Sequence, residues 1–431
     1  MESVKPIDAA TMDATTFEKH LTRFLLGILT YSITTVIIAS EIPLGVLFNI
    51  AQLVGLGLYM YYWIKLASLQ NISAWYLRIV LFLFLTWQCY IVYHGFKFDY
   101  PYLKEYLFSD GYRLLPYLVP LVVFIPVKNP LFLQKLFGYI HKFGVFFLCA
   151  FPFLFFVLTS DLSFSEQYIW VFAMGSGLTL LTAFYHPNKN VQIAVIVMLV
   201  GLLLATIMAR RNIMLSCGCF LLFALFLIIL VNKNIMLAKK IGFLCLAGLI
   251  GLAGYVVFVS NQDGMFSKIT QKATEDSRTE VFLGFFLDME NKDIVIGKGL
   301  NGTYYAPGID EDWVGGRSKT NNYRDLDYRV YIECGYLQLM LNGGVVYVAL
   351  FLLVLLPAIV LGLVFSKNIF SKGCALVIFL WLIDMVPFGL PAFTPRYFIV
   401  WFCVALCYSK ELRRMSDEQI KELLYPQSQT I

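Results

Sequence analysis

Runs of about 20 apolar residues recur along this chain, and they constrain its fold more than any other feature. A helix of about that length crosses the hydrocarbon core of a bilayer. Of the 431 residues, 59% are hydrophobic and 14% are charged, whereas soluble domains carry about a quarter charged residues. We therefore expect an all-α, polytopic membrane protein, because helices satisfy their own backbone hydrogen bonds within lipid.

The apolar runs predict about twelve spans. Thr15 and Glu18 have the spacing of a capping box that opens the first helix. The tenth span is long enough to tilt or to project from the bilayer. The chain then divides into a tail (1–23), spans one to nine (24–259), a large loop (260–335), spans ten to twelve (336–409) and a second tail (410–431). The spans are expected near 24–39, 44–64, 75–94, 112–127, 139–159, 168–185, 191–208, 213–231, 241–259, 336–365, 374–391 and 396–409.

Lysine and arginine follow the positive-inside pattern when the N-terminus is cytoplasmic. The loops on that side include Lys65, Lys128, Lys239 and Lys367, whereas the short outer loops are poor in both residue types. The net charge of +5 is attributed to these loops, so a nucleic acid is not expected as a partner. This orientation places loop 260–335 outside the cytoplasm.

Loop 260–335 is rich in charged and aromatic residues, unlike the apolar segments on either side. A long loop in a compact protein is usually functional or disordered, and the aromatic content argues against disorder. We therefore expect a small, partly helical cap over the membrane domain. Its glycine-rich segment, Gly297 to Gly302, lacks the spacing of a nucleotide-binding loop and is interpreted as a turn.

Arginine is placed where it could bind phosphate at the outer face. Arg210 and Arg211 occupy a four-residue outer turn against the charge bias, and Arg278 follows span nine where a short helix could start. A guanidinium gives two parallel, charge-assisted hydrogen bonds to phosphate. The alternatives are that Arg210 and Arg211 reach lipid headgroups and that Arg278 forms a solvated ion pair.

Two further charges interrupt apolar segments. Asp384 lies within span eleven, where a carboxylate usually faces a cavity or a partner, and Arg396 follows as a possible outer-surface cation. Arg113 is expected to be interfacial rather than catalytic. The four histidines are dispersed without zinc spacing, and no nucleotide fingerprint is present, so no metal or other cofactor is expected.

The remaining candidates lie on the cap. Asp325, Asp327 and Glu333 precede span ten and are candidate general bases for a hydroxyl acceptor. Aromatic residues stack on sugar faces, although the same side chains could form the core of the cap. The candidate glycan contacts are Arg317, Arg324, Arg329, Tyr323 and Trp313.

The layout resembles the bacterial O-antigen polymerase and ligase superfamily, which includes Wzy-type polymerases and WaaL-type ligases. The similarity lies in about twelve spans, a large loop between spans nine and ten, the Arg210-Arg211 turn, Arg278 after span nine, and the stretch from Glu333 to Gly344. The resemblance implies glycan transfer from an undecaprenyl-pyrophosphate donor to a lipid-linked acceptor at the periplasmic face of the inner membrane. It also implies that Arg210 or Arg211, and Arg278, hold the pyrophosphate, and that a chain-length regulator is a partner.

The sequence departs from the family at one position. Many members carry a His-Asn pair late in the large loop, where the histidine is thought to act as the base of ligases, and this loop contains no histidine. The departure favours a polymerase over a ligase. A transporter or lipid-linked-glycan flippase stays an alternative, since Asp384 and the prolines after it would suit one. A flippase, however, needs no folded cap and usually shows two related halves.

Overall fold

The computed structural model describes residues 13–39, 45–68, 72, 75–111, 113–208, 210–231, 277–305, 328–387 and 389–426. Within these residues the fold is a helical bundle in which seven helices are long and apolar enough to cross a membrane. The expected all-α membrane fold is therefore confirmed. The seven helices are α1 (Ala14–Ala39), α2 (Gly45–Leu66), α3 (Trp75–Gly95), α5 (Pro130–Ser160), α8 (Asn188–Ile207), α9 (Arg211–Val231) and α15 (Gly335–Leu363).

Shorter helices lie where the sequence predicts the fourth, sixth, eleventh and twelfth spans. The first of these is a 3-10 helix with Pro116 and Pro120 inside it, and proline removes the backbone donors that a longer α-helix needs. The predicted ninth span, 241–259, lies outside the described residues. The shorter helices are η2 (Leu115–Phe124), α6 (Leu162–Phe172), α7 (Gly175–Leu181), η3 (Ala183–Tyr185), α16 (Ile369–Asp384) and α17 (Pro395–Tyr408).

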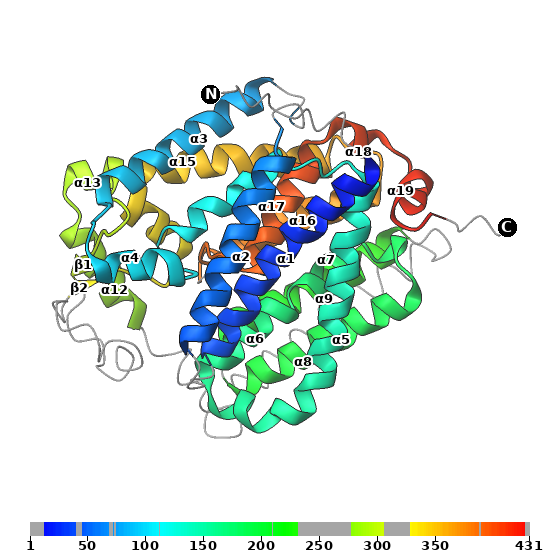
Figure 1. Ribbon diagram of the computed structural model, residues 1–431, viewed down its shortest axis with the longest axis horizontal. Helices are drawn as coiled ribbons and strands as arrows, with labels where there is room; N and C mark the ends of the chain where they lie inside the picture. Colours follow the sequence, from blue (N-terminus) through cyan, green and yellow to red (C-terminus); the bar gives the residue numbers. More distant parts are fainter. Residues whose placement is uncertain are drawn as a thin grey trace.

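Helix α17 is the centre of the bundle (Figure 1). It contacts α1, α6, α7, α15, α16 and η2, and every residue from Tyr397 to Tyr408 is buried. A helix that is apolar all round is suited to such a central position, since it exposes no polar face that needs water. The enclosure holds Arg396, one residue after the start of α17, against the surrounding helix ends.

Two glycines allow α1 and α2 to pack as a close antiparallel pair. A Cβ atom on Gly27 would lie 2.6 Å from the Tyr59 backbone nitrogen, and one on Gly55 would lie 2.8 Å from the Tyr31 nitrogen. Small residues permit this approach of two backbones in membrane helices. The start of α1 differs from the expectation. Asp13, rather than Thr15, accepts hydrogen bonds from the first turn, including one of 3.2 Å from the Thr16 nitrogen.

Helix α15 is broken near its start, and this break corrects the expectation of one long tilted or projecting span. Gly344 has φ 68° and ψ −173°, a conformation outside the helical region that side chains other than glycine rarely adopt. The Val295 carbonyl of the cap lies so close that a Cβ atom on Gly344 would be 2.0 Å from its oxygen. The cap therefore occupies the space where a continuous helix would run.

The described part of the cap has its own small core. It comprises α12 (Ser277–Asp288), α13 (Asn291–Ile296) and the two-residue strands β1 (Tyr304–Tyr305) and β2 (Tyr328–Arg329), which pair antiparallel with Tyr304 opposite Arg329. Phe285, Met289, Tyr304 and Ile332 form the core together with Leu341 of α15. At least these cap aromatics serve packing rather than sugar binding.

The glycine-rich turn between α13 and β1 seats the cap on the bundle, which confirms its interpretation as a turn. The Lys298 nitrogen donates to the Leu341 carbonyl (2.7 Å), and the Leu300 nitrogen donates to the Ile91 carbonyl (3.0 Å). Gly297 and Gly299 have φ of 75° and 81°, which glycine adopts without strain. The turn thereby joins α15 to α3, and these two helices lie side by side in Figure 1.

Arg113 helps to hold the glycine-rich turn against the bundle. It is buried within the protein, whereas the sequence predicted a position at the membrane interface. Its side chain is fully buried and forms an ion pair of 2.6 Å with Glu105 of α4 (Tyr100–Phe108). Arg113 Nη1 also donates to Asn301 Oδ1 (2.6 Å), and Asn301 Nδ2 donates to the Gly95 carbonyl (2.7 Å). The terminal helices α18 (Lys410–Arg414) and α19 (Asp417–Leu424) lie at the opposite end of the molecule (Figure 1).

Candidate functional site

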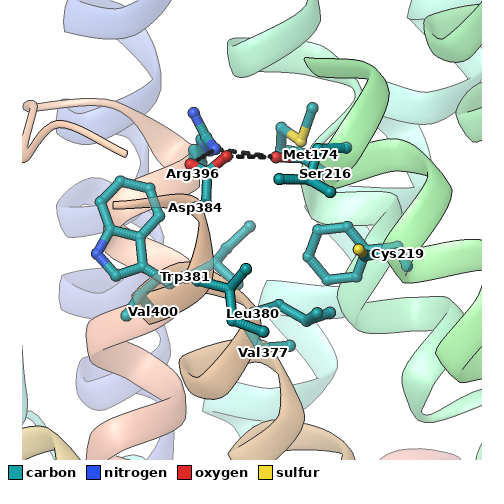
Figure 2. Close-up of a pocket in the computed structure, with 13 residues that line it drawn as sticks. Met174, Ser216, Cys219, Val377, Leu380, Trp381, Asp384, Arg396 and Val400 are labelled. Carbon is teal, nitrogen blue, oxygen red and sulfur yellow. Dashed lines mark hydrogen bonds and ion pairs between the residues drawn. The ribbon is translucent and has the colours of Figure 1, made fainter. Parts of the chain in front are cut away.

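An arginine and a carboxylate meet where α16 ends and α17 begins, near the cap. Asp384 is the last residue of α16, and its carboxylate forms an ion pair with the Arg396 guanidinium. Ser216 of α9 joins them: its hydroxyl donates to Asp384 Oδ1 (2.9 Å) and accepts from Arg396 Nη2 (3.2 Å). Figure 2 shows these three side chains together at one end of a pocket. The expectation that Asp384 faces a cavity and a partner is thus confirmed.

Two tryptophan rings hold the Arg396 guanidinium. Its carbon lies 4.9 Å from the centre of the Trp381 ring and 5.6 Å from that of Trp170. Cation–π attraction strengthens when the groups are desolvated, and the Arg396 side chain is 11% exposed. A third helix, α6, therefore helps to fix this cation through Trp170.

The pocket beneath the ion pair is mainly apolar. Its walls come mainly from α9, α16 and α17, with Met174 completing the lining, and the space open to a water-sized sphere is about 30 Å³. Figure 2 shows Leu380, Val377 and Val400 along the wall away from the charged pair. A charged end beside an apolar wall matches the chemistry of an amphiphile, although a space of this size holds about two waters rather than a lipid tail.

A second arginine–carboxylate pair joins α6 to the start of α9. Arg210, directly before α9, has its Nε atom 2.6 Å from a carboxylate oxygen of Glu166. Both side chains are mostly buried, with 22% and 15% of their surfaces exposed. Because Ser216 is on α9, this helix connects the Arg210 pair with the Arg396 pair.

Glu333 lies within electrostatic range of the Arg210–Glu166 pair. The Gly335 nitrogen, at the start of α15, donates to the Met385 carbonyl (2.8 Å), which brings the segment before α15 next to Asp384. The charges of Arg210, Glu333 and Arg396 all act on the Glu166 carboxylate. Arg210, Arg396, Glu166, Asp384 and Glu333 therefore form one group, named the charge cluster below.

Of the residues selected from the sequence, Arg210 pairs with Glu166, and Glu333 acts electrostatically on the same carboxylate. Arg211 begins α9 and is exposed, and Arg329 lies in β2 opposite Tyr304. Arg278 lies in the first turn of α12, as expected for a short helix there, and its side chain is outside the described part of the chain. Six further candidates also lie outside the described residues: Asp325, Asp327, Arg317, Arg324, Tyr323 and Trp313.

Burial excludes Tyr304 as a proton acceptor near Glu333. It raises the pKa of the Tyr304 phenol to about 12, with Glu333 adding to the shift and Arg329 opposing it. The protonated hydroxyl donates to the Tyr331 carbonyl (3.2 Å). Tyr304 therefore contributes to the cap as a packed, hydrogen-bonded side chain.

Glu166, Ser216, Trp170 and Trp381 were missed by the sequence reasoning. A signal existed for Glu166, because it is the only charged residue in the segment 162–188 and an acidic group in an apolar helix usually has a partner. Ser216 and the tryptophans carry no such signal. Within the described ranges, no three His, Cys, Asp or Glu side chains are grouped closely enough to hold a metal ion.

Comparisons with protein-family models, with curated proteins and with solved structures found no match for this chain. The functional argument accordingly depends on the charge cluster, its pocket and the cap.

Proposed function

We propose that this protein polymerises undecaprenyl-pyrophosphate-linked oligosaccharide repeat units into a surface polysaccharide. The observation that carries the proposal is the charge cluster, in which two arginines and a loop carboxylate meet beside an apolar pocket. The protein would be a metal-independent glycosyltransferase with about twelve spans. It would work in the bacterial inner membrane with the cap and the cluster facing the periplasm, as the lysine distribution favours.

The donor would be the growing glycan on its lipid pyrophosphate. Arg210 and Arg396 supply fixed positive charge where the leaving pyrophosphate gains negative charge, and such preorganised charge stabilises a transition state. Arg211 and Arg278, close to Arg210 in sequence and on the cap respectively, would complete the anion site. The lipid tail would remain in the bilayer, since the pocket below Arg396 has room for about 30 Å³ only.

The acceptor would be the lipid-linked new repeat unit. Its hydroxyl oxygen attacks the anomeric carbon of the donor sugar, a new C–O bond forms, and the bond between that carbon and the pyrophosphate oxygen breaks. The Glu333 carboxylate takes the hydroxyl proton, and the lipid pyrophosphate leaves as an anion. Displacement in one step inverts the anomeric configuration. A chain-length regulator is the expected protein partner.

A gel of surface glycan from a strain that lacks the gene tests the proposal. We expect glycan that carries a single repeat unit, because its precursors are made and exported but not joined. Polymer that accumulates on its lipid without transfer to the lipid core would instead identify a ligase. Normal glycan together with altered uptake of a solute would identify a transporter and refute the proposal.

A further inference from the structure

The two arginines of the charge cluster are held with unequal strength. Arg396 contacts Asp384, Ser216 and two tryptophan rings, and its ion pair is 11% exposed on the arginine side and 5% on the carboxylate side. The Arg210–Glu166 pair is more exposed, at 22% and 15%. An anion arriving from the cap side therefore meets a permanently seated Arg396 and a more accessible Arg210.

The cluster also holds more carboxylates than arginines, three against two, without a ligand. Arg210 faces Glu166, Arg396 faces Asp384, and Glu333 adds one further carboxylate. A pyrophosphate that entered this group unchanged would bring its negative charges next to three carboxylates, and like charges repel strongly where water is scarce. Tight binding requires that at least one carboxylate stop competing for its arginine.

We propose that Glu166 is an exchangeable counter-ion that neutralises Arg210 until the phosphate of a polyprenyl-pyrophosphate substrate replaces it. Glu166 is a positioning residue in this scheme, because it acts through Arg210. The resting pair avoids an unpaired buried guanidinium, which would be costly in this setting. The inference deepens the proposed function and rests on its pyrophosphate donor.

The position of Glu166 on α6 keeps its carboxylate close to the charge cluster after the exchange. Glu166 is on α6, four residues before Trp170, which contacts Arg396, and it lies within electrostatic range of Glu333. The Glu166 carboxylate that leaves Arg210 therefore stays among the other charges of the cluster, from which it can return to Arg210 once the lipid pyrophosphate has left.

The test compares Glu166→Gln with the unaltered protein in binding of farnesyl pyrophosphate. The full chain is placed in phosphatidylcholine nanodiscs, so that no anionic lipid competes, and tryptophan fluorescence reports binding near Trp170 and Trp381. The glutamine keeps the side-chain shape and removes the competing charge. We expect roughly tenfold tighter binding, together with slower polymerisation of lipid-linked repeat units.

Asp288→Asn is the matched control. Asp288 and Lys298 form a cap ion pair of the same 2.6 Å length with similar exposure, 19% and 20%, outside the charge cluster. We expect its affinity for farnesyl pyrophosphate to equal that of the unaltered protein. The double variant Glu166→Gln, Arg210→Gln should lose the gain in affinity, because the gain depends on the freed guanidinium.

The outcomes separate the two proposals. If the unaltered protein and Glu166→Gln both fail to bind farnesyl pyrophosphate, the pyrophosphate donor of the proposed function is wrong. If the unaltered protein binds and Glu166→Gln binds equally or more weakly, Glu166 is a structural partner and the exchange is refuted. If Glu166→Gln fails to fold, Glu166→Asp replaces it in the same binding experiment. The shorter aspartate should compete less for Arg210 and so raise the affinity for farnesyl pyrophosphate in low salt. An unchanged affinity of Glu166→Asp would refute the exchange.

Discussion

The Asp384 carboxylate and the Arg396 guanidinium pair across the loop that joins α16 to α17, and they close one end of an apolar pocket. Each residue stands at a helix end, so the pair fixes the relative position of the two helices. Ser216 connects the same pair to α9. The stability of this junction is open to direct measurement.

Removal of one partner of this pair should destabilise the protein. Asp384→Asn leaves the Arg396 charge with little exposure and no full counter-charge, which costs about 3–5 kcal/mol for buried pairs. Thermal unfolding in detergent measures the effect. The double variant Asp384→Leu, Arg396→Met replaces the pair with apolar groups and should recover most of the loss. Equal unfolding temperatures for Asp384→Asn and the unaltered protein would show that the pair contributes nothing.

The arginines of the proposed anion site should be needed for polymer formation. Arg210→Ala, Arg211→Ala and Arg278→Ala are each expected to abolish polymer, since fixed charge on the leaving pyrophosphate is lost. Arg211→Lys and Arg278→Lys should also lack polymer, because the lysine ammonium does not offer the two parallel hydrogen bonds that a planar guanidinium gives to phosphate. A glycan gel reports polymer, and membrane fractionation checks insertion. Arg414→Ala, an exposed position in α18, is the control, and unchanged polymer in all three variants would disprove the pyrophosphate site.

The carboxylate of Glu333 should contribute to rate rather than to stability. Glu333→Gln keeps the shape and removes the proton acceptor, so polymerisation should slow by about 10²- to 10⁴-fold with little change in unfolding temperature. A time course with purified lipid-linked repeat units measures the rate. Glu290→Gln, an exposed cap position, should be as active as the unaltered protein. A rate within twofold for Glu333→Gln would assign the base elsewhere.

The anchor of the cap should depend on Asn301. Asn301→Ala removes the acceptor for Arg113 Nη1 and the donor to the Gly95 carbonyl, and unsatisfied buried groups cost about 1–3 kcal/mol each. We expect faster proteolysis within the cap and a lower unfolding temperature. Asn291→Ala, exposed at the start of α13, is the matched control. Identical cleavage rates for the two variants would mean that the cap is held by other contacts.

Acid should loosen the attachment of the C-terminal segment through His186. This imidazole lies between Thr182 Oγ1 and the Tyr425 hydroxyl, each at 2.9 Å, and burial lowers its pKa from 6.5 to about 4. The unfolded chain therefore takes a proton at a higher pH than the folded protein. Stability is unaffected above pH 6.5 and falls as the pH drops toward 4, by about 2 kcal/mol at pH 5. Unfolding temperatures at pH 7 and pH 5 measure this loss.

A His186→Gln variant isolates that effect from other titrating groups. Glutamine retains hydrogen bonding to Thr182 or Tyr425 without a titratable ring. We expect the difference in unfolding temperature between pH 7 and pH 5 to shrink in this variant. If the pH dependence is the same with and without His186, other groups cause it.

Much of the bundle was predictable because hydropathy is a property of neighbouring residues. The apolar runs located α2, α3 and α9 to within a few residues, and the prolines around Pro387 indicated a break in the helix after Asp384. The break at Gly344 was not predicted, since a glycine in an apolar run is compatible with a continuous helix. The Val295 carbonyl that packs against Gly344 belongs to a distant part of the chain, and it leaves no room for a side chain at this position.

The charge cluster was predictable only in part. An isolated charge within an apolar helix marked Asp384 as a residue that needs a cavity or a partner, because an unpaired charge is costly there, whereas Arg210 and Arg396 were predicted to face phosphate or the outer surface. The partners of these charges could not be predicted from the sequence. Glu166 and Arg210 lie on separate helices, and so do Ser216 and Asp384, and no local spacing relates them. Local composition therefore established the helices and the positions that require neutralisation. The folded bundle selected which charges neutralise one another, because that choice depends on which helix ends pack side by side.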